Sequence, residues 1–202
     1  MDVWVETVGA RRSLLATFES LSSDQWDVPS LCEGWTVRDV LAHLVLAAKP
    51  PRRRFATAVL RTRSFDAANR DLAIADAKAP VGDLLSSYRK VIDNRFAPPG
   101  WPKAAPLTDI VLHGFDVRIP LGLEVEGPAA EVYEPVLGLL LGRQGGTFVR
   151  SGRPKVRWVA TDLDWSGGTD GSDDEVRGTM VGCTRCSMPV SVRTATPSNF
   201  TR

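Results

Sequence analysis

The chain has 202 residues, of which 43% are hydrophobic and 24% are charged. This is the balance of a globular protein, and the length suits one sizeable core with at most a small appendage. The 25 Lys+Arg residues against 24 Asp+Glu residues give a net charge of +1, which excludes a general electrostatic attraction to nucleic acid or to anionic membranes.

The N-terminal segment lacks the apolar stretch of a signal peptide, because residues 1–20 carry several charged side chains. No apolar run is long enough to span a bilayer. Cysteine usage agrees with a reducing compartment, since Cys32 stands alone and only Cys183 and Cys186 form a Cys-x-x-Cys pair. One such pair is a weak signal for zinc or redox chemistry, and we interpret it as two incidental thiols. We therefore expect a cytoplasmic protein with no membrane partner.

Helical periodicity dominates the first 142 residues. Apolar residues recur every three or four positions in 4–21, 37–48, 55–74, 81–92, 107–117 and 128–141. Thr36 and Asp39 resemble a capping box that opens the second helix, and Pro80 is well placed as the first residue of a later one. Four long helices with short extra ones predict a mainly α protein built on a helical bundle.

The pattern changes after residue 150. Val156, Trp158 and Ala160 alternate with more polar residues, as in a strand. Gly167-Gly168 and Gly171 are typical of a turn, and Val176 suits a returning strand. A lone hairpin is marginally stable, so we expect it to pack on the bundle. The predicted organisation is a bundle over 1–150, a small β appendage over 151–178 and a poorly ordered tail over 179–202.

Both histidines lie on predicted helices. His113 follows Asp109 by four residues, which places the two side chains on one helical face. A carboxylate and an imidazole one turn apart can share a divalent ion, and His43 from a facing helix can supply a third ligand. The alternative is that both histidines are satisfied core residues. Spacing alone leaves this question open.

Two further residues follow His113 on the same helix. Asp116 is three positions on, where it suits a carboxylate that orients an imidazole or contacts a bound ligand. Arg118 points well away from His113, so we interpret it as a salt-bridge residue or a residue at the rim of a substrate site.

Three segments resemble the mycothiol-dependent maleylpyruvate isomerase family, which belongs to the wider DinB-like superfamily. The first, Leu31–Leu44, is similar to the family's Cys-x-Gly-Trp-Thr-Val-x-Asp-x-x-x-His segment. The second, Asp109–Gly122, is similar to its carboxylate-x-x-x-His-Gly-x-Asp-x-Arg segment. The third, Val156–Trp165, resembles the strand that opens the family's C-terminal part. The resemblance covers roughly residues 3–178, and truncation or a frameshift is one hypothesis for its end there.

The resemblance implies a DinB-like four-helix bundle in which His43, Asp109 and His113 bind a divalent metal, usually zinc. The family's isomerase has glutamate where this chain has Asp109, whose side chain is one methylene shorter. The resemblance also implies mycothiol or a similar low-molecular-weight thiol as cosubstrate, activated by the metal and added to a small electrophile. Cys32 as nucleophile is an alternative, but we favour a small packing residue at the helix start. We interpret Trp35 and Trp101 in the same way, as packing at the end of the bundle.

We therefore expect a metal-dependent thiol transferase or isomerase whose partners are a small thiol and a small electrophile. The alternatives are a non-catalytic, stress-related metal-binding bundle and a metal-assisted hydrolase. The short run Arg52–Arg54 suits a solvated face, so no nucleic-acid partner is expected. The sequence also allows a homodimer.

Overall fold

The structure is a computed structural model that describes residues 1–125, 130–141, 156–162, 164–168 and 174–179. Its helices are α1 (Val3–Glu19), the 3-10 helix η1 (Ser23–Asp27), α2 (Val37–Ala48), α3 (Arg52–Thr62), α4 (Phe65–Asp76), α5 (Val81–Val91), α6 (Ala104–Arg118) and α7 (Ala130–Leu141). Three short strands follow, β1 (Arg157–Ala160), β2 (Ser166–Gly168) and β3 (Glu175–Gly178). The prediction of a mainly α protein with a small β appendage is confirmed.

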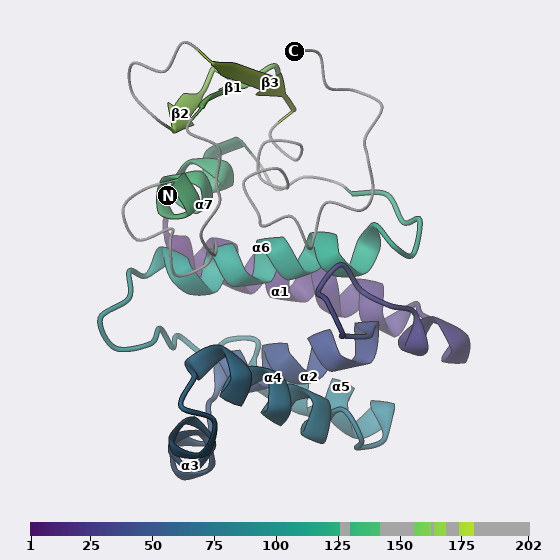
Figure 1. Cartoon of the computed structure of the whole chain (residues 1–202). Helices are drawn as coiled ribbons and strands as arrows, with labels where there is room; N and C mark the ends of the chain where they lie inside the picture. Colours follow the sequence, from purple (N-terminus) through teal and green to yellow (C-terminus); the bar gives the residue numbers. More distant parts are fainter. Residues whose placement is uncertain (126–129, 142–155, 163, 169–173, 180–202) are drawn as a thin grey trace.

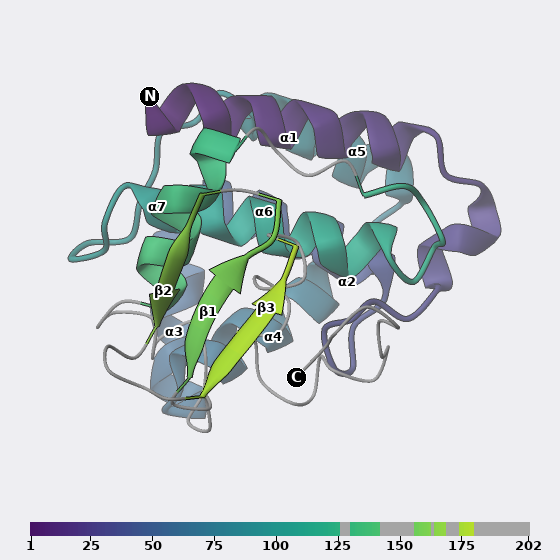
Figure 2. The same ribbon diagram turned by 90° about the horizontal axis from the view of Figure 1, so that it is seen from above.

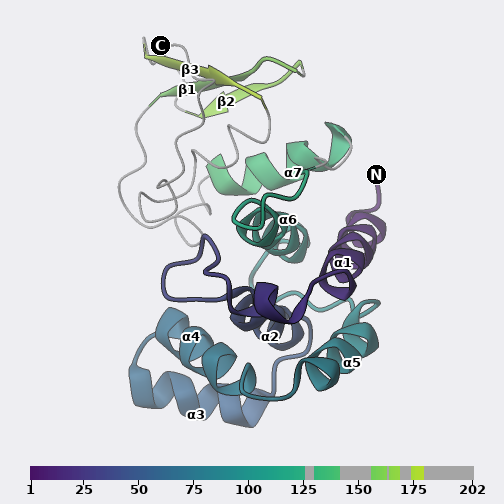
Figure 3. The same cartoon turned by 90° about the vertical axis from the view of Figure 1, so that its right-hand side faces the viewer.

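Helices α1, α2, α5 and α6 form the bundle. Each contacts two others around a closed ring, in the order α1, α6, α2 and α5, which Figure 3 shows nearly end-on. Helices α3 and α4 pair with each other and pack on α2 through α4. Helix α7 lies on the outer side of α6, between the bundle and the sheet (Figure 1). The four bundle helices therefore enclose the core, and α3, α4 and α7 cover it from outside.

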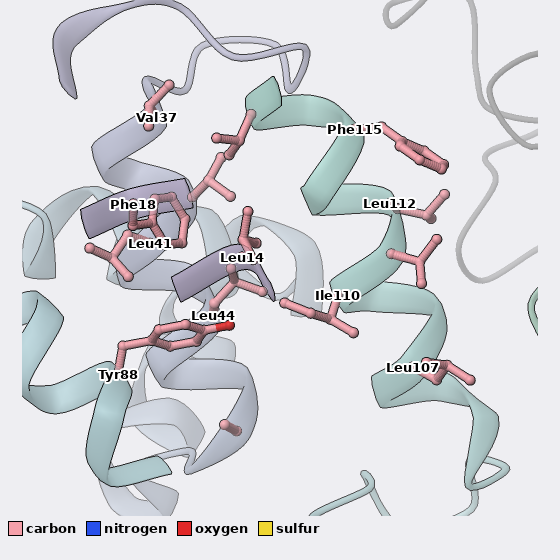
Figure 4. Packing of buried hydrophobic residues seen from close by; sticks show 14 of the residues in the cluster. Leu14, Phe18, Val37, Leu41, Leu44, Tyr88, Leu107, Ile110, Leu112 and Phe115 are labelled. Atoms are coloured by element: carbon pink, nitrogen blue, oxygen red, sulfur yellow. The ribbon is translucent and has the colours of Figure 1, made fainter. Parts of the chain in front are cut away.

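The core is made of apolar side chains from every helix of the ring. Leu14 and Phe18 of α1, Leu41 of α2, Tyr88 of α5 and Leu107 of α6 are almost fully buried (Figure 4). Burial of such side chains is the main driving force that holds α2 against α6. This packing matters for function, because those two helices carry both histidines.

Helix α2 begins where the sequence predicts. The side chain of Thr36 accepts a hydrogen bond from the Asp39 backbone N–H, and Asp39 Oδ2 accepts one from the Thr36 N–H at 2.8 Å. This reciprocal capping box satisfies two backbone donors that would otherwise lack partners at the helix start. It fixes the first turn of α2 two turns before His43.

The structure differs from the sequence pattern at both ends of α5. Pro80 is the N-cap of α5, with Val81 as its first residue, and the helix ends at Val91 although the apolar pattern continues. The backbone N–H groups of Asp83 and Leu84 bond to the Pro80 carbonyl, as an N-cap position requires. Ile92 is buried although the helix ends before it. The apolar pattern reports burial, so it does not mark the last residue of the helix.

The sheet is more than the predicted hairpin. Strand β1 pairs with β2 in antiparallel fashion and with β3 in parallel fashion, giving the order β2-β1-β3 (Figure 2). Gly167 and Gly168 lie within β2 rather than in a turn. Gly168 has φ +107°, and a Cβ atom there would lie 2.6 Å from the Val156 carbonyl oxygen, so only glycine fits.

Three predictions fall on residues outside the described part of the chain. They are the boundary at residue 150 and the turn at Gly171, together with the tail over 179–202, of which only Thr179 is described. Cys183 and Cys186 also lie there. Among the described residues, no helix is both long and apolar enough to cross a membrane.

Candidate metal centre

The bundle brings His43, Asp109 and His113 together. His43 comes from α2, and Asp109 and His113 come from successive turns of α6. One donor atom from each lies within 4.8 Å of the others. The His43 side chain is 6% exposed, that of His113 is 14% exposed and that of Asp109 is 25% exposed. The three donors thus meet in a sheltered position that solvent reaches from the Asp109 side.

The spacing of these donors fits a small divalent ion. Asp109 Oδ1 is 3.4 Å from His43 Nε2 and 3.5 Å from His113 Nε2. Zinc bonds of about 2.0–2.1 Å in tetrahedral geometry place neighbouring ligand atoms roughly 3.3 Å apart. Two imidazoles and one carboxylate are also a donor set that zinc accepts, with one position left for an exogenous ligand. The residues present therefore fit a divalent metal, even with aspartate in the middle position.

The two imidazoles are held in different ways. His113 Nδ1 lies 3.0 Å from Asp116 Oδ2, which leaves Nε2 directed toward Asp109. This carboxylate and imidazole pair is the kind that orients metal-binding histidines. His43 Nδ1 is buried and has no hydrogen-bond partner among the described residues. Its ring is instead positioned by packing, 5.1 Å from the Trp35 ring and 4.7 Å from the His113 ring.

The charges at the centre affect metal binding in opposite ways. The ionised Asp109 favours a cation, whereas the raised pKa of His113 means that its imidazole must release a proton before Nε2 can bind one. Burial would raise the pKa of Asp109, but the imidazoles of His43 and His113 hold that pKa well below its ordinary range. Burial would lower the pKa of His113, but Cys32, Asp109 and Asp116 hold it well above its ordinary value. Asp109 is therefore ionised at neutral pH and needs to lose no proton to bind a metal.

The segment before α2 covers the centre from one side. A bridge between Pro29 and Thr36 closes it into a short loop, in which Gly34 has a φ of +76° that favours glycine. The Leu31 backbone N–H donates to the Asp116 carbonyl oxygen at 3.1 Å, which ties the loop to α6. Trp35, at the end of this loop, faces both imidazoles, with its ring 6.0 Å from that of His113. The prediction that Trp35 packs at the bundle end missed these two contacts.

Cys32 also lies in this loop and does more than fill space. Its Sγ donates to Asp116 Oδ2 at 3.1 Å and lies 3.7 Å from His113 Nδ1. Burial raises the pKa of the Cys32 thiol, although His113 opposes that shift. Cys32 is thus a neutral S–H donor to the carboxylate that orients His113.

Arg118 extends from α6 toward α1. Its Nε and Nη2 donate to Thr17 Oγ1 at 3.1 Å and to Ser13 Oγ at 3.0 Å, and both acceptors lie on α1. Arg118 therefore links α6 to α1. Neither of these contacts is with His43, Asp109 or His113.

Two cavities of about 350 Å³ each meet at His43 and Asp109. The first, which we call the apolar cavity, is lined mainly by carbon-rich side chains, including Leu44, Phe55, Phe96, Trp101 and Ile110, with Arg11 in its wall. The second, which we call the polar cavity, is lined by Cys32, Trp35 and His113 and by the polar residues Glu33, Asp66, Asn69 and Arg70. Trp101, predicted to be a packing residue, lines both cavities. His43, Asp109 and Trp101 line both cavities, so the two cavities adjoin each other at the candidate metal centre.

Sequence periodicity gave no signal for several of these lining residues. Arg11 comes from α1, Asn69 from α4, and Phe96 and Trp101 from the connection between α5 and α6. Each lies outside the two helices that carry the histidines, so only tertiary packing brings them to the centre.

The contact between His113 and Asp116 gives a testable prediction. We expect Asp116→Asn to lower the zinc affinity roughly 10–100-fold, because the substitution removes the charge that orients His113 while nearly keeping the shape. Competition with a chromophoric chelator measures this affinity. Asp93→Asn, the same change at an exposed carboxylate of the loop after α5, serves as the control. Equal zinc affinity in Asp116→Asn and the wild type would contradict the orienting role.

Comparison with known proteins adds two findings. The model of the mycothiol maleylpyruvate isomerase N-terminal domain family matches residues 9–118, more than half of the chain. Two solved structures are similar, a mycothiol-dependent maleylpyruvate isomerase and a mutant of it. Each is 14% identical, with a TM-score of 0.58 over 92% of this chain and 87% of the other. No curated protein matches the sequence. The family match ends at Arg118, so it includes all three residues of the candidate metal centre.

Proposed function

Because the chain belongs to the mycothiol maleylpyruvate isomerase N-terminal domain family, we propose that it is a metal-dependent isomerase or transferase that uses a low-molecular-weight thiol. One observation carries this proposal. Asp109 Oδ1 lies 3.4 and 3.5 Å from the Nε2 atoms of His43 and His113, at the point where two cavities meet. The arrangement supplies three ligands, an open side and room for two reactants.

His43, Asp109 and His113 are the proposed ligands, and zinc is the favoured ion because two imidazoles and a carboxylate suit it. When bound there, the metal would supply the Lewis acidity that keeps a coordinated thiol deprotonated at neutral pH. Asp116 Oδ2 lies 3.0 Å from His113 Nδ1, where it would accept a hydrogen bond from Nδ1–H and leave Nε2 as the atom that would hold the ion. Trp35 covers both imidazoles and shelters them from water.

We assign one proposed reactant to each cavity. Glu33, Asp66, Asn69 and Arg70 in the polar cavity offer both donors and acceptors, which suits a hydroxyl-rich and amide-rich thiol such as mycothiol. The apolar cavity is then left for the electrophile. Both cavities reach His43 and Asp109, so a thiol sulfur and an electrophilic carbon can meet at the centre.

The test combines elemental analysis with thiol titration. We expect the purified protein to hold about one zinc per chain and to convert an electrophile only in the presence of both metal and mycothiol, with the thiol consumed in a transfer and regenerated in an isomerisation. Maleylpyruvate and a panel of other activated alkenes should be compared, with product analysis to separate isomerisation from transfer. Metal-dependent turnover without thiol would favour hydrolysis instead. A zinc-loaded protein that leaves every thiol and electrophile unchanged would favour a non-catalytic bundle.

A further inference from the structure

Arg11 is a buried cation with an incomplete set of partners. It lies on α1 and is 5% exposed. Its Nη1 donates to the backbone carbonyl oxygens of Ile92 at 3.0 Å and Asn94 at 2.7 Å, just beyond the end of α5. Nη1 also lies 3.5 Å from the Val91 carbonyl oxygen, so the hydrogen bonds that Arg11 donates among the described residues all come from Nη1. Burial lowers the pKa of Arg11, and Asp109 and Asp93 oppose this shift, but neither carboxylate lies within ion-pair distance of Arg11. Buried charges are normally paired, so this guanidinium has capacity left for an anion.

This cation forms part of the wall of the apolar cavity. Phe55, Phe96, Trp101 and Ile110 line the same space, and His43 and Asp109 lie where it meets the metal centre. The cavity therefore combines three features: a fixed positive group, an apolar body and access to the proposed reactive centre. Apolar walls with a few placed polar groups are typical of small-molecule sites.

We propose that the apolar cavity binds the electrophile and that this electrophile is an aromatic or similarly apolar monocarboxylate, with its carboxylate on Arg11. That the ligand is an electrophile rests on the proposed function, but its binding to the cavity needs neither metal nor thiol. A guanidinium binds a carboxylate through parallel charge-assisted hydrogen bonds, and the available Nε and Nη2 are the atoms that such a pair needs. The apolar body then lies among the aromatic side chains of the cavity.

The cavity disfavours two other classes of ligand. In the metal-free protein, a small dicarboxylate such as maleylpyruvate would bring a second negative charge among apolar side chains and beside Asp109, where an unpaired ion is costly. A neutral molecule would leave Arg11 unpaired. The volume of about 350 Å³ is at the low end of the roughly 300–1,000 Å³ that ligand sites occupy, which suits a molecule with a single ring.

The test uses three probes on the metal-free protein in the presence of a chelator. Cinnamate has a ring, a conjugated alkene and one carboxylate. Cinnamamide has the same shape without the charge, and fumarate has two charges without the ring. By isothermal titration calorimetry we expect cinnamate to bind at least about 10-fold more tightly than cinnamamide, as a charge-assisted pair implies, and more tightly than fumarate.

Substitutions locate the binding. Arg11→Met should remove the preference for cinnamate over cinnamamide, and cinnamamide binding then shows that the variant is folded. Arg11→Lys keeps the charge and should keep part of the preference. Ala47→Phe, which fills the cavity, should weaken both ligands, whereas Ala75→Phe on the exposed side of α4 should change neither.

Four results would overturn the assignment: equal affinity for cinnamate and cinnamamide, fumarate binding at least as tightly as cinnamate, cinnamate binding only to the zinc-loaded protein, or no binding at all. The three-ligand comparison on the wild type decides the matter even if the Arg11 variants do not fold. The calorimetry is done without metal or thiol, so a negative result would not contradict the proposed thiol-dependent activity. Absence of that activity would likewise not contradict the carboxylate site.

Discussion

Replacing either imidazole with alanine is expected to abolish tight zinc binding. His43→Ala and His113→Ala should each lower the zinc affinity by more than about 100-fold, since loss of an outer-sphere partner alone costs roughly 10–100-fold. Each variant leaves only Asp109 and a single imidazole at a centre whose donors are 3.4–3.5 Å apart. Competition with a chromophoric chelator gives the affinity, and elemental analysis gives the bound zinc per chain.

A matched pair of carboxylate variants completes this experiment. Asp109→Asn should also reduce zinc binding strongly, because it removes the ionised oxygen between the two imidazoles. Asp93→Asn makes the same chemical change at a side chain that is 75% exposed and should bind zinc like the wild type. Circular dichroism establishes that every variant is folded. Stoichiometric, tight zinc in both histidine variants would show that His43 and His113 are packed side chains and not ligands.

Much of the candidate centre could be predicted from the sequence, because two of its three proposed ligands are close in the chain. Asp109 and His113 are one helical turn apart, so helix geometry alone brings them together. The position of Asp116 likewise follows from its three-residue spacing to His113. His43 required the further step of a facing helix, and the capping box at Thr36 and Asp39 fixes where that helix begins.

The remaining parts of the site depend on contacts between distant segments. Arg11 reaches backbone carbonyls about eighty positions away, and Cys32 reaches Asp116 across 84 positions. No local period encodes such pairs, since they arise only when α1, α5 and α6 pack into one ring. Gly168 shows the same limit in the sheet. A pair of glycines is typical of a turn, but here a close approach to the Val156 carbonyl requires glycine within a strand.

Stability of the ring should depend strongly on Phe18. This side chain is 1% exposed and joins three elements, since it stacks on Trp26 of η1 at 5.7 Å and meets the edge of Tyr88 of α5 at 6.0 Å. We expect Phe18→Ala to lower the free energy of unfolding by roughly 3–5 kcal/mol, through lost apolar burial and the cavity left behind. Urea unfolding followed by circular dichroism measures the change.

Leu60→Ala is the matched control for this prediction. Leu60 is 80% exposed on α3, so its truncation should change the free energy of unfolding by no more than about 0.5 kcal/mol.

Phe18 also lies on the helix that packs against α6, which carries Asp109 and His113. Zinc should therefore restore part of the stability that Phe18→Ala loses, because a ligand bound only by the folded state stabilises it. Equal unfolding midpoints for Phe18→Ala and Leu60→Ala would contradict the role of Phe18, and no effect of zinc on either would contradict a metal centre that spans α2 and α6.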